Sequence, residues 1–203
     1  MVTAKVDFKR ELTDSYTAKR SPAAVQVPEL AFLMIDGHGD PNTSQEYRHA
    51  VSALFSVSYA ARFTLKHAGV IDFGVMPLEG LWWAADMSAF WIDDKSAWDW
   101  TMLIMQPDEV TADVLSEAKT RAAAKAPATA LERLRLERFA EGLAAQVLHV
   151  GPYSAEGPAI ASLHAFITGQ GRELAGKHHE IYLGDPRRSA PDKLKTIIRQ
   201  PMR

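Results

Sequence analysis

The first part of the chain switches between the hydrophobic period of a strand and that of a helix. An apolar run at residues 30–35 predicts a buried strand. Thr43 is the predicted N-cap of the helix that follows, whose apolar residues recur at helical spacing to about Lys66. Residues 71–78 and 98–105 predict two further strands, so the order is strand, helix, strand, strand.

The last part of the chain contains a similar series of elements. Residues 134–139 and 143–150 predict two strands, which a turn at Gly142 joins into a hairpin. Ser154 is the predicted N-cap of the next helix. The segment at residues 196–201 predicts an edge strand before the C-terminus.

A strand, a glycine-containing turn and a helix thus occur once in each half of the chain, which predicts an internal duplication. We expect an α+β fold with pseudo-twofold symmetry, in which two sheet portions join into one curved sheet with helices on one face. The groove between the halves is then the natural place for a ligand. The predicted organisation is one domain over residues 1–203, with an N-terminal arm at 1–28, a first half at 29–126 and a second half at 127–203.

Residues 178–183 predict a strand that combines an apolar face with a chemically reactive one. Its period of two places His178, Glu180 and Tyr182 on one side, and Ile181 on the side that faces a core. A carboxylate and a phenol that project together can act on a ligand where aromatic groups shield them from water. The alternative is that this side is a solvated polar surface.

Aromatic residues are concentrated in the middle of the chain, where all five tryptophans lie between residues 82 and 100. On the strand predicted at 98–105, Trp98 and Trp100 share a face. Such rings either wall a ligand site or pack in a core or a partner interface, and both interpretations stay open. The candidate ligand-binding residues are Trp82, Trp83, Phe90, Trp98, Trp100 and Tyr153.

Composition and charge narrow the range of partners. With 23 basic and 25 acidic residues, the net charge of -2 provides no general attraction to nucleic acid or to an anionic membrane. The chain has no cysteine, which excludes disulfides, zinc-thiolate sites and cysteine nucleophiles and fits a reducing cytoplasm. The sequence contains neither a signal peptide nor an apolar run of about 18 residues. We expect a cytoplasmic protein without nucleic-acid or membrane partners, and the oligomeric state is left open.

The motifs of several enzyme classes are absent. The seven histidines form no His-Glu-x-x-His motif, and the adjacent His178 and His179 point to opposite faces of their strand, which is poor geometry for one metal ion. The sequence also has no Gly-x-Ser-x-Gly nucleophile motif and no glycine-rich nucleotide-binding motif. We therefore expect no metal and no cofactor.

Four motifs, in order along nearly the whole chain, resemble the GyrI-like small-molecule-binding family. They are Asp36-Gly-His-Gly-Asp-Pro-Asn42, Pro77-Leu-Glu-Gly-Leu-Trp-Trp83, His149-Val-Gly-Pro-Tyr153 and His178-His-Glu-Ile-Tyr-Leu-Gly-Asp-Pro-Arg-Arg188. The set is similar to a free-standing branch of that family, without a fused DNA-binding module. The resemblance implies the family's fold, which is duplicated βαββ (SHS2-type) units.

The same resemblance implies a reaction. Free-standing members include hydrolases that use an aromatic cage to open the cyclopropane ring of DNA-alkylating cyclopropanoids of the yatakemycin and CC-1065 type. By this resemblance Glu180 aligns and deprotonates water, Tyr182 assists the dienone oxygen, and Trp82 or Trp83 belongs to the cage. One alternative is binding of flat or cationic small molecules without turnover, with Glu180 as the counter-charge. Another is a regulator that contacts DNA gyrase.

Overall fold

The computed structural model describes residues 5–85 and 95–203, and contacts among them form two compact units. Unit 1 comprises Met1–Phe8, Leu30–Met76 and Trp83–Phe139, taken within the described ranges. Unit 2 comprises Lys9–Glu29, Pro77–Trp82 and Ala140–Arg203. The division into halves at residues 29–126 and 127–203 stays a prediction.

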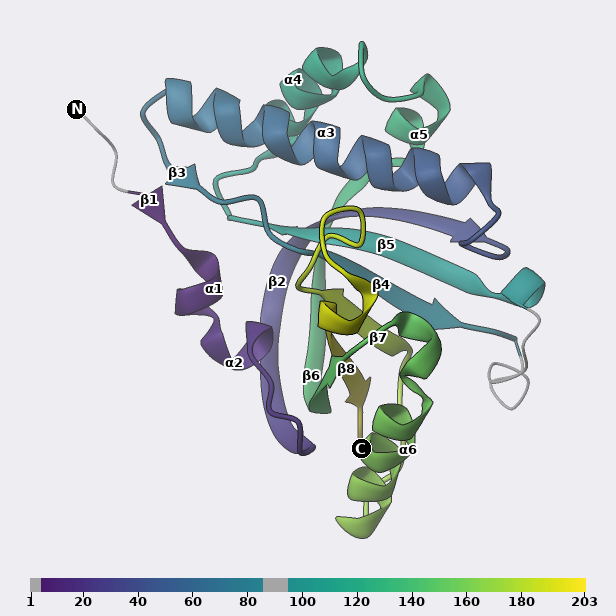
Figure 1. Ribbon diagram of the computed structural model, residues 1–203. Coiled ribbons are helices and arrows are strands. Elements are labelled where there is room, and N and C mark those ends of the chain that lie inside the picture. The colour runs from purple at the N-terminus through teal and green to yellow at the C-terminus, as the bar shows by residue number, and fades with distance from the viewer. Residues whose placement is uncertain (1–4, 86–94) are drawn as a thin grey trace. The chain divides into compact units, whose positions relative to one another are not determined.

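Within the described residues, unit 1 combines three α-helices and a 3₁₀ helix with an antiparallel and a short parallel pair of strands. Its elements are β1 (Lys5–Val6), the second part of β2 (Ala23–His38), α3 (Gln45–His67), β3 (Asp72–Phe73), η1 (Lys95–Ala97), β5 (Asp99–Gln106), α4 (Ala112–Ala122) and α5 (Ala128–Arg133). The antiparallel register runs from Ala31 opposite Gln106 to His38 opposite Asp99. Helix α3 packs against β5, α4 and α5 (Figure 1).

Helix α3 is the helix predicted after the first strand. Its buried face contains Ala50, Leu54, Val57, Ala61 and Leu65, which recur every three or four positions. The predicted cap at Thr43 is wrong by one residue. Ser44 is the N-cap, because its hydroxyl oxygen accepts a hydrogen bond from the backbone N–H of Tyr47 at 3.1 Å.

The strand predicted at residues 71–78 is instead two strands. β3 ends at Phe73, and β4 (Leu78–Trp83) begins five residues later. The two strands have different partners, because β3 pairs with β1 and β4 pairs with β7. The strand predicted at 98–105 is confirmed as β5, with a shift of one residue.

The centre of unit 2 is an antiparallel sheet in which β4, β7, β8 and β6 lie side by side. The elements of this unit are α1 (Phe8–Glu11), α2 (Thr13–Tyr16), the first part of β2, β4, the part of β6 (Arg135–Val150) from Ala140 on, η2 (Tyr153–Ala155), α6 (Gly157–Gly169), β7 (His178–Tyr182), η3 (Pro191–Lys193) and β8 (Lys195–Pro201). The prediction of an edge strand at 196–201 is wrong, because β8 pairs with β7 on one side and β6 on the other.

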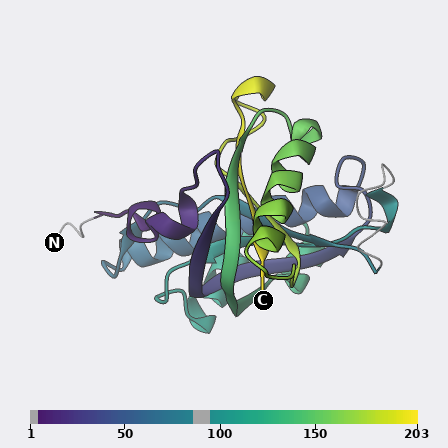
Figure 2. The ribbon, with the colours of Figure 1, turned by 90° about the horizontal axis from the view of Figure 1, so that it is seen from below.

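Helix α6 covers one face of this sheet (Figure 2). Ile160, Leu163 and Ile167 of α6 form one apolar cluster with Val147 of β6 and Ile198 of β8. Burial of these aliphatic side chains, each contributing about 1.5–3 kcal/mol, holds the helix on the sheet.

The hairpin predicted around Gly142 is absent, because β6 runs without reversal from Arg135 to Val150. Gly142 has a φ of 75°, a conformation that glycine adopts without strain, so it allows an irregularity within one strand. A glycine signal alone cannot distinguish such a bulge from a turn. The cap predicted at Ser154 is also wrong, since Ser154 lies in η2 and Glu156 is the N-cap of α6.

The antiparallel strand pairs and the helices confirm the α+β class. The duplication of βαββ units and its pseudo-twofold axis stay predictions. The segment predicted as an arm contains α1, α2 and the first residues of β2. None of the helices in the described part of the chain is long and apolar enough to span a bilayer.

Candidate functional site

One face of β7 carries the residues that the sequence predicted as reactive. The strand is confirmed, and its alternation places His178, Glu180 and Tyr182 on the same side. Glu180 lies opposite Ile198 of β8, which packs in the cluster under α6. Directly opposite residues share a face, so this is the side of the sheet that α6 covers. The Glu180 side chain nevertheless remains 15% exposed, so water can reach it.

Four side chains form a hydrogen-bond chain on this face. The indole Nε1–H of Trp82 donates to the hydroxyl oxygen of Tyr182 at 3.1 Å. The Tyr182 hydroxyl in turn donates to Oε2 of Glu180 at 2.7 Å. At the other carboxylate oxygen, Nε2 of His178 lies 3.1 Å from Oε1. Each oxygen of Glu180 therefore has a partner from its own strand, and the period of two in the sequence had placed these three side chains on one face.

Strand β4 places Trp82 beside His178 and Tyr182 of β7. Gly80 lies opposite Glu180, and Trp82 lies opposite His178. The Trp82 ring folds back over Gly80, where an added Cβ would be 2.6 Å from the indole Nε1. Only glycine leaves this space, so Gly80 is what allows the indole to reach Tyr182.

Tyr153 lies beside the same group. Its ring meets the ring of Tyr182 edge to face, with centroids 5.5 Å apart and an interplanar angle of 72°. Burial raises the pKa of Tyr153 to about 12, and the negative charges of Glu156, Glu180 and Asp185 add to the effect. Tyr153 is 38% exposed, so it lies at the open side of the group.

Trp83, Trp98 and Trp100 belong to unit 1. Trp100 is completely buried, with its ring over Gly37 and its indole N–H donating to the carbonyl of Gly39 at 3.3 Å. Trp83 and Trp98 are partly buried. Phe90 lies outside the described residues. A ligand-binding role for these four side chains stays a prediction.

The opposite face of β7 carries a buried ionic network that the sequence analysis missed. His179 Nε2 lies 3.0 Å from Glu79, and its Nδ1 lies 2.9 Å from Glu141. Glu141 also accepts a hydrogen bond from Arg199 at 2.9 Å, and Glu79 accepts one from the hydroxyl of Tyr16 at 2.7 Å. Two cations and two carboxylates thereby balance each other out of contact with water.

Attraction between the opposite charges of this network determines which of its side chains are protonated. Burial would lower the pKa of His179, but the charges and hydrogen bonds of Glu141 and Glu79 outweigh it and raise the pKa to about 9. Burial would raise the pKa of Glu141, but His179 and Arg199 lower it to about 2. Burial, followed by the charge of Glu79, raises the pKa of Tyr16 well above its usual value. At neutral pH, His179 is a cation, Glu141 an anion and Tyr16 a neutral donor.

The same network holds the segment around α2. Arg199 donates to the backbone carbonyl of Ser15, and the Gln146 amide donates to the carbonyls of Asp14 and Thr17 at 2.8 and 2.9 Å. Arg199 and Gln146 also bond to each other. A charged residue inside the apolar run of β8 was the sequence signal for this cluster, because a strand buries a charge only with partners.

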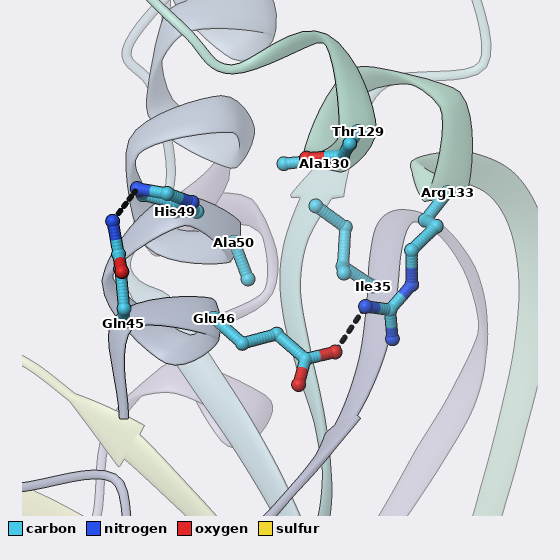
Figure 3. A pocket seen from close by; sticks show the side chains of 8 residues that line it. All are labelled: Ile35, Gln45, Glu46, His49, Ala50, Thr129, Ala130 and Arg133. Atoms are coloured by element: carbon cyan, nitrogen blue, oxygen red, sulfur yellow. Dashed lines mark hydrogen bonds and ion pairs between the residues drawn. The ribbon is translucent and has the colours of Figure 1, made fainter. Parts of the chain in front are cut away.

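A separate pocket of about 260 Å³ lies in unit 1, between α3 and α5 (Figure 3). Its lining residues are Ile35, Gln45, Glu46, His49, Ala50, Thr129, Ala130 and Arg133. Glu46 forms an ion pair with Arg133 across it, and Gln45 contacts His49. The volume is below the 300–1,000 Å³ typical of small-molecule sites, and no predicted site residue lines it.

No group of three or more His, Asp or Glu side chains that could hold a metal ion occurs within residues 5–85 and 95–203. The side chains on the β7 face of unit 2 offer proton transfer. Glu180 can accept a proton from a water molecule, and Tyr182 can donate one to a ligand oxygen.

Comparisons with known proteins support a ligand-binding role. Residues 21–202 match the family model described as the GyrI-like small molecule binding domain. An uncharacterized conserved protein from Listeria innocua is 43% identical, with a TM-score of 0.90 over 98% of this chain and 100% of that one. Two structures described as hydrolases from the same organism are 42% and 41% identical, with TM-scores of 0.88 and 0.84 and the same coverage. The chain matches none of the curated proteins with which it was compared.

Proposed function

Because the chain belongs to the GyrI-like small-molecule-binding family, we propose that it hydrolyses cyclopropanoid DNA-alkylating agents of the yatakemycin and CC-1065 type. The observation that carries the proposal is the hydrogen-bond chain from Trp82 through Tyr182 to Glu180. It joins a proton acceptor to a proton donor on one strand face. The description of two relatives as hydrolases supports turnover rather than binding alone.

In the proposed reaction, Glu180 is the general base. Its carboxylate takes a proton from water while the water oxygen forms a bond to the cyclopropane carbon. The strained carbon–carbon bond breaks, and its electron pair passes into the dienone, which becomes a phenolate. Gain of aromaticity and release of ring strain drive this step. The partly exposed carboxylate is accessible to the water that this role requires.

Tyr182 is the proposed acid. Its hydroxyl turns from Glu180 to the dienone oxygen and donates its proton as negative charge develops there. The indole N–H of Trp82, 3.1 Å from the Tyr182 oxygen, stabilises the phenolate that Tyr182 becomes. The proton that Glu180 took from water then returns to Tyr182 along their 2.7 Å contact. The substrate gains one water, and both side chains recover their starting forms.

The proposed ligand is a flat, hydrophobic aromatic molecule. Tyr153 and Tyr182 present rings at this site, and Tyr153 is open to solvent. We propose Trp82, whose indole contacts the Tyr182 hydroxyl, as a further ring of the cage. Stacking on such rings would exclude bulk water, so that Glu180 acts on the one water it aligns.

Mass spectrometry tests the proposal. A CC-1065-type cyclopropanoid incubated with a catalytic amount of protein should gain the mass of one water, over many turnovers. Glu180→Gln keeps the shape of the side chain but removes the proton acceptor, and should lower kcat by about 10²- to 10⁴-fold. Glu173→Gln is the matched control, because Glu173 is an exposed glutamate that pairs with Arg203. Parent-level turnover by Glu180→Gln would show that the assigned base is wrong.

The second candidate function is binding without turnover, which the description of the family favours. In that case, Glu180 is the counter-charge for a cationic ligand and the rings contribute cation–π contacts of about 0.5–2 kcal/mol each. Loss of at most one equivalent of cyclopropanoid, with no water-addition product, would favour this function over hydrolysis.

A further inference from the structure

His178 is the least accessible member of the group on the β7 face. Its side chain is 2% exposed, whereas that of Glu180 is 15% exposed. The imidazole Nε2 is 3.1 Å from Oε1 of Glu180, whereas Tyr182 donates to Oε2. A ligand that reaches Glu180 from solvent would therefore meet the carboxylate and not the imidazole.

The direction of the contact follows from the chemistry of the acceptor. An ionised carboxylate has no proton and can only accept hydrogen bonds. When Glu180 is ionised, His178 must carry its proton on Nε2, so the imidazole donates to Oε1. With Tyr182 donating to Oε2, one donor holds each oxygen, and rotation of the carboxylate is restricted.

Other ionisable groups lie around this pair. Burial raises the pKa of Tyr153, and the charges of Glu156, Glu180 and Asp185 raise it further. On α6, burial lowers the pKa of His164, and the charge of His178 lowers it further. The neutral form of His164 is therefore favoured, and the direct partners of the Glu180 carboxylate on its own strand are His178 and Tyr182.

We propose that His178 is a positioning residue for Glu180, fixing the carboxylate by donating from Nε2 and keeping it ionised in its partly enclosed place. The inference rests on the proposed function in so far as Glu180 is the base. His178 acts through Glu180 and does not touch the substrate. Its effect should therefore be on kcat and its pH dependence, with KM unchanged.

Two substitutions separate positioning from packing. His178→Gln places an amide N–H donor near the position of Nε2, whereas the shorter His178→Asn places it near Nδ1. His178→Asn should lower kcat about 10- to 100-fold, the range expected for a lost hydrogen bond to a charged group. The acid limb of its pH–rate profile should move to higher pH, because a carboxylate with one donor fewer is protonated more readily. His178→Gln should restore most of the rate and the original acid limb.

An NMR experiment tests the inference without turnover. With ¹³C-labelled glutamate, the carboxyl of Glu180 should titrate at a higher pH in His178→Asn than in the parent or in His178→Gln. ¹⁵N shifts of the parent should show His178 protonated on Nε2 whenever Glu180 is ionised. This measurement needs no substituted protein. A parent with an unprotonated Nε2 beside an ionised Glu180, or equal Glu180 titrations in all three proteins, would overturn the positioning role. A parent that does not convert the cyclopropanoid would instead overturn the proposed function, while the NMR comparison still tests the role of His178.

Discussion

The indole of Trp82 lies directly over Gly80, where a Cβ atom would be 2.6 Å from the ring nitrogen and 2.9 Å from the adjacent ring carbon. Both distances are shorter than van der Waals contact allows, so the ring occupies the place that any side chain at position 80 would take. Gly80 also lies opposite Glu180 in the β4–β7 register. Because Gly80 on β4 has no side chain, the Trp82 indole has room to reach the polar residues of β7.

Gly80→Ala should move the Trp82 ring and break its hydrogen bond to Tyr182. We expect a loss of about 1–3 kcal/mol in the free energy of unfolding, as for an overpacked core, together with changed indole fluorescence. Chemical denaturation and emission spectra would measure both effects. Gly169→Ala is the control, because a Cβ at Gly169 meets nothing within 4 Å. An unchanged Trp82 environment in Gly80→Ala would contradict the close-approach argument.

Trp82→Phe and Tyr182→Phe test the hydrogen-bond chain that runs from Trp82 through Tyr182 to Glu180. Trp82→Phe keeps a ring but removes the indole N–H, and Tyr182→Phe removes the proton that is proposed to reach the dienone oxygen. Tyr182→Phe should lower kcat, by less than Glu180→Gln does, with little change in ligand affinity. Trp82→Phe should have a smaller effect, since it removes only one donor to the developing phenolate. Steady-state kinetics on a cyclopropanoid would check this order, and a larger loss in Trp82→Phe than in Tyr182→Phe would contradict it.

The sequence predicted the elements whose signal is local. The period of two in residues 178–183 correctly placed Glu180 beside Tyr182, and the helical spacing after residue 44 correctly predicted α3. The prediction was wrong where one residue type is typical of two different local structures. Gly142 permits a bulge as readily as a turn, so the sequence predicts a hairpin where one strand continues.

Contacts between distant segments could not be predicted from such patterns. His179 and Glu79 are 100 positions apart, and Tyr16 and Glu79 are 63 apart. Periodicity shows on which face of a strand a residue lies, but not which other strand pairs with that strand. For that reason His179 looked like a polar residue on an apolar face, although it is the centre of a buried ionic network.

Tyr16→Phe tests how strongly the network holds the segment around α2. The substitution leaves the ring in place but removes the hydroxyl that donates a hydrogen bond to the buried carboxylate of Glu79. We expect the free energy of unfolding to fall by about 1–3 kcal/mol, the cost of leaving a buried acceptor with one donor fewer. Tyr59→Phe is the matched control, since Tyr59 is 47% exposed, and should change stability by less than about 0.5 kcal/mol. Equal stabilities of the two variants in urea would show that the Tyr16–Glu79 bond contributes nothing.

Stability should depend on pH through the same network. The folded-state pKa of His179 is about 9, above its ordinary value of 6.5, so folding favours the protonated form. This contribution is fully present below about pH 6.5 and is lost as the pH rises through 9. The shift corresponds to about 3 kcal/mol. For Glu141 the sign is opposite, because its pKa is lowered from 4.5 to about 2, so its contribution is present above pH 4.5 and is lost as the pH falls toward 2.

Urea unfolding at several pH values would measure this dependence. The parent should be most stable between about pH 4.5 and 6.5 and should lose about 2–3 kcal/mol between pH 6.5 and 9. His179→Gln should be less stable at pH 6, because it removes a cation from between two buried carboxylates, and its alkaline slope should be smaller. His67→Gln, at an exposed position in the last turn of α3, should keep the slope of the parent. If His179→Gln and the parent lose stability equally between pH 6.5 and 9, His179 is not the group that titrates there, and its ion pairs do not stabilise the fold.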